Sequence, residues 1–145
     1  MRCAMLLLIA GTANADAGIP WVVLPESLGP EMMRQCSRNT PDHIQRFWTP
    51  GNADIVIMED RLKAYEKYHH VELQLQLARS HRQYVGFIKG GRRFIYGNFY
   101  PASGHAPLDE TKTVVDICDG GPGLWGVVYS VDDGVFSDFE HNGVA

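Results

Sequence analysis

The sequence predicts an α+β fold in which one main helix packs on an antiparallel meander sheet of about five strands. Two observations support this prediction. A stretch with helical spacing of apolar residues precedes several short runs rich in β-branched and aromatic residues. Short turns rich in glycine and aspartate separate those runs, and strands with short connections pair with their neighbours in the chain. The chain of 145 residues, 45% of them hydrophobic, is long enough for one domain with a core.

The helix is predicted over residues 50–68. Thr49 is a suitable N-cap, and Pro50 suits the first helical position because its missing N–H would have no partner there. One face is apolar at intervals of three and four residues, namely at Ile55, Met58, Leu62 and Tyr65. Glu59 and Lys63, four residues apart, are expected to form an ion pair on the outside.

Residues 69–81 are ambiguous. Leucines alternate with polar residues from Val71 onwards, which is a strand pattern, but leucine, glutamine and glutamate are strong helix formers. We favour a helix here, separated from the first by a break near His69 and His70.

A β-hairpin is predicted over residues 82–101. Glycine adopts positive φ angles without steric cost, so Gly90 and Gly91 suit a two-residue type I′ turn in which Lys89 faces Arg92. Three further strands are predicted over residues 111–118, 124–131 and 135–140.

The N-terminal segment, residues 1–15, is predicted to be a cleaved signal peptide. A short basic start is followed by the apolar run AMLLLIA and by Ala13-Asn14-Ala15, which matches a signal-peptidase site. The alternative is a cytosolic N-terminal helix. Residues 16–47 hold four prolines and are expected to form an irregular arm, and residues 48–145 a single α+β domain. The apolar run is too short for a transmembrane segment, so we expect a periplasmic or secreted protein.

Cys36 and Cys118 remain after Cys3 is removed with the signal peptide, and an even pair in an oxidising compartment predicts a disulfide. The alternative is a pair of thiols that bind a metal. No Cys-x-x-Cys motif or nearby paired histidine accompanies them, so we expect no metal site and no cofactor.

Charge is distributed unevenly along the chain. The net charge of −4 argues against nucleic-acid binding, which favours basic surfaces. Residues 79–93 hold five basic residues and no acid, whereas residues 109–140 hold eight acids and one lysine. The first interpretation is that the two segments are neighbours that neutralise each other. The second is that one of them contacts a partner.

The helix followed by a curved meander resembles the cystatin-like class of α+β folds over roughly residues 48–141. Gln83-Tyr84-Val85-Gly86 differs in spacing from the cystatin inhibitory loop and lies within a strand, so no inhibitor residues are transferred. The stretches RQYVGFIKGGRRFIYGNFYP and ICDGGPGLWGVVYSVDDGVF also resemble short exported bacterial proteins of unassigned function. This second resemblance implies export and no particular chemistry.

No catalytic residues are predicted, because the sequence lacks the common nucleophile, phosphate-binding and metalloprotease motifs. An acid pair drawn from Asp116, Asp119 and Glu140 is a weak hydrolase signal, since Asp119 opens a glycine-rich turn. Tyrosine and arginine often anchor protein interfaces, which makes five hairpin residues the predicted binding set: Arg92, Arg93, Lys89, Tyr96 and Tyr100.

Three functions follow from these observations. The first is a non-catalytic protein-binding module of inhibitor or immunity type, with an unknown protein partner in the cell envelope. The second is a cleft-type enzyme or small-ligand carrier on a cystatin- or NTF2-like sheet, which requires a pocket between helix and sheet. The third is a structural component of an envelope assembly.

Overall fold

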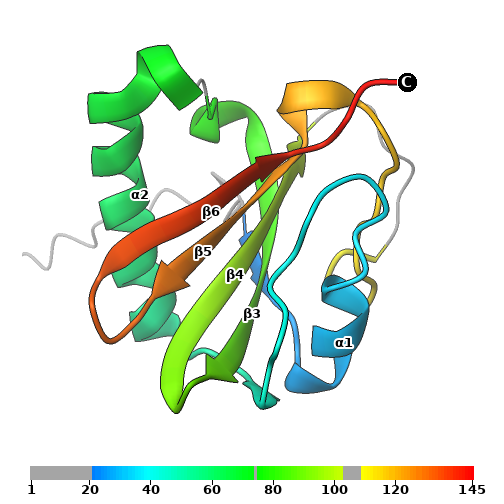
Figure 1. Cartoon of the computed structure of the whole chain (residues 1–145). Coiled ribbons are helices and arrows are strands. Elements are labelled where there is room, and N and C mark those ends of the chain that lie inside the picture. The colour runs from blue at the N-terminus through cyan, green and yellow to red at the C-terminus, as the bar shows by residue number, and fades with distance from the viewer. Residues whose placement is uncertain (1–20, 74, 103–108) are drawn as a thin grey trace, which may run out of the picture.

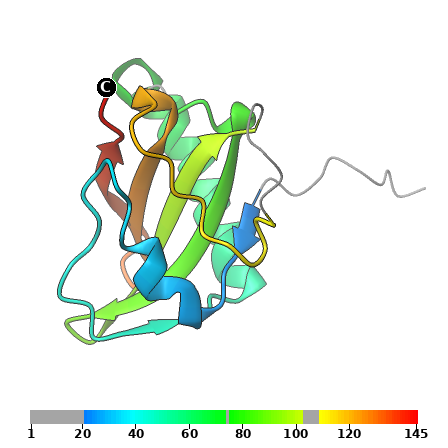
Figure 2. The ribbon, with the colours of Figure 1, turned by 90° about the vertical axis from the view of Figure 1, so that its right-hand side faces the viewer.

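The structure is a computed structural model that describes residues 21–73, 75–102 and 109–145. The predicted signal peptide lies outside these residues. A long helix covers one face of a six-stranded sheet, and a short helix with irregular segments covers the other (Figures 1 and 2). The elements run in the order β1 (Trp21–Val23), η1 (Glu26–Leu28), α1 (Gly29–Met32), β2 (Arg46–Trp48), α2 (Asn52–Leu73), η2 (Leu77–Arg79), β3 (Ser80–Lys89), β4 (Arg92–Pro101), η3 (Gly121–Gly123), β5 (Trp125–Ser130) and β6 (Val135–His141).

The α+β class is confirmed, but the sheet is mixed, with the strand order β1-β3-β4-β5-β6 and β2 also paired to β3. The prediction of a purely antiparallel sheet is wrong because β1 pairs with β3 in parallel. Between these two strands the chain passes through α1, β2 and α2, and such a long connection allows a parallel pair. Residues 21–48 of the chain therefore contribute two strands to the sheet itself.

The hairpin of β3 and β4 has the predicted register. Lys89 is opposite Arg92, and the pairing continues without a shift to Ser80 and Pro101. Gly90 and Gly91 have φ angles of 57° and 72°, which suit a type I′ turn. These two strands are the longest of the sheet, and other parts of the chain pack on both of their faces away from the turn.

Residues 111–118 do not form the predicted strand; they cross the sheet face opposite α2 as an irregular segment. Both edges of β4 are already occupied, by β3 and β5, so this segment has no free central strand to join. Side-chain amides of the sheet supply its hydrogen bonds instead. Gln83 Oε1 accepts from the N–H of Val115 at 2.8 Å, and Asn98 Nδ2 donates to the Val115 carbonyl at 2.7 Å.

Helix α2 begins at Asn52 rather than at Pro50, and Thr49 is not its N-cap. The N–H of Gly51, just before the helix, donates to the Asp54 carboxylate at 3.2 Å. The Thr49 hydroxyl accepts from the N–H of Glu26 instead. The helix also continues through the predicted break to Leu73, and β3 begins at Ser80. The preference for helix was thus right for residues 69–73 and wrong about the break.

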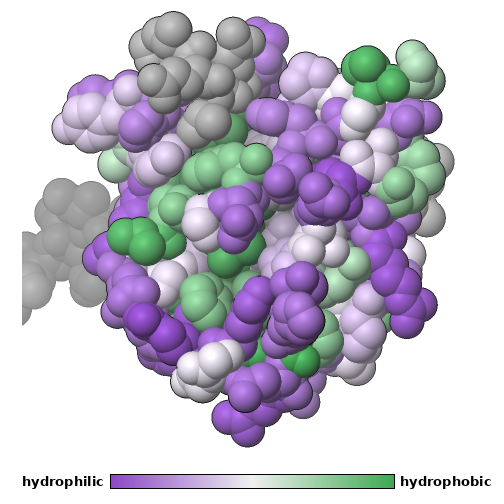
Figure 3. Space-filling view, viewed as in Figure 1, coloured by the Kyte–Doolittle hydropathy of each residue, from purple (hydrophilic) through white to green (hydrophobic). Residues whose placement is uncertain are grey.

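The predicted apolar face of α2 packs on the sheet, where Ile55, Met58 and Leu62 are fully buried. Tyr65 lies at the open side of this layer, stacked on Phe139 of β6 with ring centroids 5.2 Å apart. Figure 3 shows apolar residues gathered in the seam between α2 and β6, surrounded by hydrophilic residues.

Glu59 does not form the predicted outer pair with Lys63. It is buried, because position 59 shares one helical face with positions 55, 58 and 62. Its carboxylate accepts from Arg82 Nε at 2.8 Å and from a second nitrogen of the same guanidinium, and the Tyr84 hydroxyl donates to it. Lys63 pairs with Asp60 on the surface instead.

Candidate functional site

A groove crosses the face of the sheet that α2 does not cover. Its volume is about 330 Å³. It extends from the end of β3 across β4 and β5 to β6, and residues 39–42 line one side of it. Figure 2 shows the irregular backbone of this stretch beside the sheet. We call it the sheet groove. Its lining residues are Asn39, Thr40, Pro41, Asp42, Phe87, Lys89, Phe94, Tyr96, Val128, Ser137, Asp138 and Glu140.

The base of the sheet groove is aromatic because alternate residues of a strand face the same side. Phe87 and Phe94 are cross-strand partners whose rings stack with centroids 5.2 Å apart. Tyr96 is two residues further along β4 and pairs with Val128. Gly126, the next residue of β5 on this face, leaves room for the Tyr96 ring, since a Cβ at position 126 would lie 2.2 Å from the Tyr96 hydroxyl oxygen.

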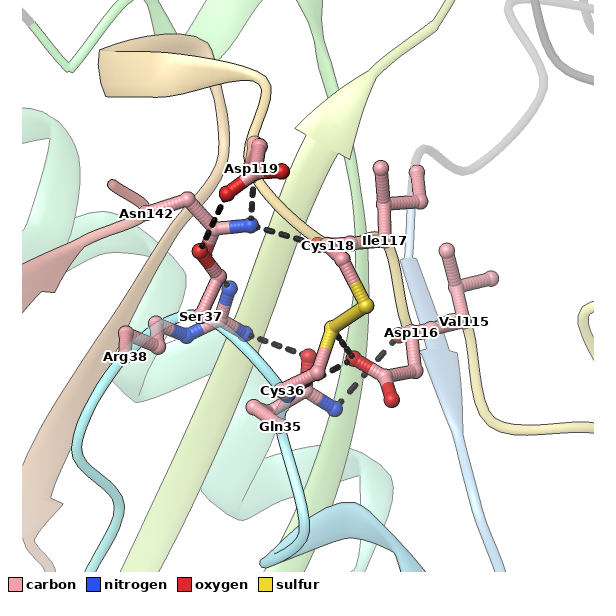
Figure 4. Close-up of a disulfide and its surroundings, with 10 residues drawn as sticks. All are labelled: Gln35, Cys36, Ser37, Arg38, Val115, Asp116, Ile117, Cys118, Asp119 and Asn142. Atoms are coloured by element: carbon pink, nitrogen blue, oxygen red, sulfur yellow. Dashed lines mark hydrogen bonds between the residues drawn. A yellow bond between two sulfur atoms is a disulfide. The ribbon is translucent and has the colours of Figure 1, made fainter. Parts of the chain in front are cut away.

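The stretch beside the groove is anchored by the predicted disulfide. Cys36 and Cys118, 82 residues apart, are joined (Figure 4). Beside the disulfide, the Asp116 carboxylate accepts from the N–H of Cys36 at 3.1 Å. The Thr40 hydroxyl donates to the Met33 carbonyl at 2.7 Å. Residues 36–42 are therefore fastened to residues 116–118 and to Met33.

Arg38 is the centre of this anchorage. Its guanidinium donates to four neutral oxygen atoms and to no carboxylate among the described residues, with part of the network drawn in Figure 4. The acceptors come from three parts of the chain: Gln35 Oε1 at 3.1 Å, the Tyr96 hydroxyl at 3.0 Å and Asn98 Oδ1 on β4, and Asn142 Oδ1 at 2.6 Å. With these contacts made, the guanidinium lies at the hydroxyl end of Tyr96 and is not part of the groove lining.

The ionisation of Tyr96 follows from this position. Burial raises the pKa of the Tyr96 hydroxyl, and the charge of Glu140 raises it further. The guanidinium of Arg38 opposes both effects without cancelling them. Tyr96 therefore stays neutral at physiological pH and contributes its ring and an uncharged hydroxyl to the groove.

The rim of the sheet groove carries three carboxylates and one ammonium group. Lys89 Nζ pairs with Asp42 at 2.9 Å, and its hydrogen bond and charge hold the pKa of Asp42 below its usual value. Within the described part of the chain, Asp138 and Glu140 form no ion pair. The lining residues thus have a net charge of −2, and the excess negative charge lies on β6.

The five residues predicted to bind lie in three places. Lys89 and Tyr96 both line the sheet groove. Arg92 and Arg93 are half-exposed at the hairpin tip. Tyr100 is buried.

Each tip arginine forms an ion pair with the β5–β6 turn. Arg92 pairs with Asp133, and Arg93 Nη2 lies 3.4 Å from Asp132. The Arg93 guanidinium also lies 5.7 Å from the centre of the Trp48 ring. These pairs favour the first interpretation of the charge pattern, that the basic and acidic segments neutralise each other.

Tyr100 packs with Val115 and Leu124 in a small cluster away from the groove. Burial, with the nearby charge of Glu110, raises the pKa of its hydroxyl well above the usual value. The residue thus contributes to the packing of the domain.

The acids considered as a catalytic pair are separate in the structure. Asp116 accepts from the N–H of Cys36, and Asp119 accepts from the Ser37 hydroxyl at 3.4 Å. Glu140 lies on the rim of the sheet groove. The three carboxylates therefore have different partners and different surroundings.

Sequence reasoning missed Arg38 and the two asparagines that hold it, Asn98 and Asn142. A single arginine in a proline-rich segment carries no motif, so no sequence signal points to it. The sequence suggests Glu140 only as a member of an acid pair. Its role at the rim depends on a bulge in β6, where the register shifts opposite Gly126 and Val128 and Asp138 has a φ angle of 53°.

Comparison of the chain with protein family models, with curated protein sequences and with solved structures finds no match. In the described residues, no helix has both the length and the apolar character that a membrane span requires.

Proposed function

We propose that the protein is a small exported protein-binding module, periplasmic or secreted, of the inhibitor or immunity type. It binds a protein partner in the cell envelope through the sheet groove and does not act as a catalyst. We also propose that the fold is cystatin-like, with α2 on one face of the antiparallel strands β3 to β6.

The observation that carries the proposal is the preformed groove with an aromatic base. Phe87 is buried and Phe94 partly buried, and both rings face a hollow that the chain's own side chains leave unfilled. Aromatic side chains in well-packed hollows supply much of the binding energy in protein interfaces. The disulfide and Arg38 hold the adjacent stretch in place, which lowers the entropic cost of binding.

Export is supported by the joined cysteines, because such a bond persists in oxidising compartments.

Site-specific photo-crosslinking tests the proposal. A photoreactive amino acid replaces Ser137 at the groove rim, and in a control chain it replaces Tyr68, which is 80% exposed on α2. In envelope extracts of cells that export the protein, we expect one discrete protein adduct from position 137 and none of that mass from position 68. The same adducts from both positions, or none from position 137, would refute binding through the groove.

The alternative is a cleft-type enzyme or small-ligand carrier, and the volume of the groove supports it because ligand pockets begin at roughly 300 Å³. The centre of the layer between helix and sheet is filled by the packed face of α2 and the Glu59–Arg82 pair, and a smaller hollow of about 230 Å³ lies at its edge between Arg61 of α2 and the β5–β6 turn. A carrier would therefore use the sheet groove. Native mass spectrometry of the exported protein distinguishes the two functions, since a carrier retains a small molecule of constant mass.

A further inference from the structure

We propose that the occupant of the sheet groove is a lysine or arginine side chain on an extended segment of the partner protein. This inference rests on the proposed function and adds the chemistry of the ligand. A basic side chain has an apolar stem and a cationic end, and the groove offers a surface for each.

The stem fits the aromatic base of the groove. The partly exposed ring of Phe94 stacks on Phe87 and lies beside Tyr96 and Val128, whose small exposed parts complete the apolar lining of the groove. Long basic side chains bury their methylene groups on such surfaces and keep the charge at the rim. A cation near the ring faces also gains attraction from the negative charge of the π-systems.

The cationic end fits the rim on β6. Asp138 and Glu140 supply two carboxylates that form no ion pair in the described part of the chain, whereas the carboxylate of Asp42 is occupied by Lys89. The other positive group nearby, Arg38, keeps its charge because its four acceptors are neutral, so the groove and this neighbour together have a net charge of −1 instead of −2. A positive ligand is therefore attracted to the β6 side, and an anionic ligand would be repelled there.

The length of the groove favours a peptide segment over a small amine. The groove crosses from β3 to β6, which are three strand spacings apart, or roughly 14 Å. An extended segment of four residues spans about that distance. A single amine would leave most of the length of the groove empty.

The test is a titration of the ¹⁵N-labelled protein, followed by NMR, with end-capped hexapeptides of glycine and serine that carry two lysines. A matched peptide with norleucine in place of lysine keeps the stem and removes the charge. We expect the lysine peptide to shift amide signals of residues 87–96 and 137–140 with a millimolar Kd, and the norleucine peptide to bind at least tenfold more weakly. Equal binding of both peptides, or no shift up to 10 mM lysine peptide, would overturn the inference.

The double variant Asp138→Asn/Glu140→Gln removes the rim charges, and asparagine tolerates the positive φ angle at position 138. We expect it to weaken the lysine peptide about tenfold. Asp60→Asn, on the exposed side of α2, should leave binding unchanged. Equal effects of the two variants would contradict the rim as the recognition element.

Failure of the inference is distinguishable from failure of the proposed function. A discrete adduct at position 137 together with no preference for lysine would overturn the ligand chemistry and leave the binding module. Selective lysine binding without any adduct would overturn the proposal of a protein-binding module, but the preference of the groove for a basic side chain would stand. A free diamine that binds as tightly as the lysine peptide would overturn the assignment to a peptide segment.

Discussion

The buried ion pair between α2 and β3 gives the strongest stability prediction. Glu59 and Arg82 are 5% and 3% exposed, and the guanidinium contacts both carboxylate oxygens. Burial alone would lower the pKa of Arg82, but the hydrogen bond and charge of Glu59 raise it, so the arginine stays charged. Replacing Glu59 with leucine leaves this charge buried without a counter-ion and removes the acceptor of the Tyr84 hydroxyl.

The expected loss for Glu59→Leu is about 3–5 kcal/mol of the free energy of unfolding, the usual cost of removing one partner of a buried pair. With a urea m-value of roughly 2 kcal/mol/M, the midpoint of unfolding falls by about 2 M. The double variant Glu59→Leu/Arg82→Met removes both charges. It should be more stable than Glu59→Leu because no buried charge is left unpaired, and less stable than the wild type because the Tyr84 hydroxyl and the Leu77 and Ser80 carbonyls lose their partners.

Urea unfolding followed by circular dichroism measures the free energies of the wild type, Glu59→Leu, Arg82→Met and the double variant, with Asp60→Asn as an exposed control expected within about 0.5 kcal/mol of the wild type. The reasoning is refuted if Glu59→Leu costs less than about 1 kcal/mol. It is also refuted if the two single variants add to the double variant within about 0.5 kcal/mol, since residues in contact should be coupled.

Three further predictions concern the disulfide, the hairpin turn and the tyrosines. Replacing Cys36 and Cys118 with serine should lower the free energy of unfolding by about 4.5 kcal/mol, the loss of chain entropy expected for a loop closed over 82 residues. Hydrogen exchange should accelerate more in residues 36–42 than in β3, and unchanged protection of residues 36–42 would contradict the anchoring role. Gly91→Ala should lower the free energy of unfolding by about 1 kcal/mol in thermal unfolding, and Gly91→Asn clearly less. The reason is that a Cβ at position 91 has room, whereas the φ angle of 72° is one that asparagine tolerates better than alanine; equal costs would contradict this. Burial, with the charge of Glu59, raises the pKa of Tyr84, and burial raises that of Tyr96, so their contribution to stability is fully present below the unfolded-state pKa of about 10 and is lost as pH rises through the folded-state values. An absorbance titration in which these tyrosines ionise without unfolding would show that they are not buried.

The sequence was most informative where local rules and tertiary contacts agree. The two-glycine turn at residues 90 and 91 determined the register of the longest hairpin, since only that register aligns both runs. The helix face at Ile55, Met58 and Leu62 was identified by spacing alone. The disulfide followed from counting cysteines, because only two remain outside the predicted signal peptide.

Sequence reasoning failed where a tertiary partner overrides a local pattern. Glu59 has a lysine four residues later, which favours a surface pair, but Arg82 lies 23 residues away and no local pattern connects them. Residues 111–118 have the composition of a strand, yet Gln83 and Asn98 provide their hydrogen bonds from the sheet face. The sheet groove was not predicted either, because its lining comes from four strands, β3 to β6, and from residues 39–42, which no local pattern connects.

The central claim is that the partner contacts the negative side of the sheet groove. Charge reversal tests it most directly, by measuring the affinity of the purified crosslinking partner for Glu140→Lys and for the surface control Asp60→Lys. The account predicts a loss of at least tenfold for Glu140→Lys, a steeper loss at low ionic strength, and no change for the control. Wild-type affinity of Glu140→Lys, or an equal loss in both variants, would contradict it.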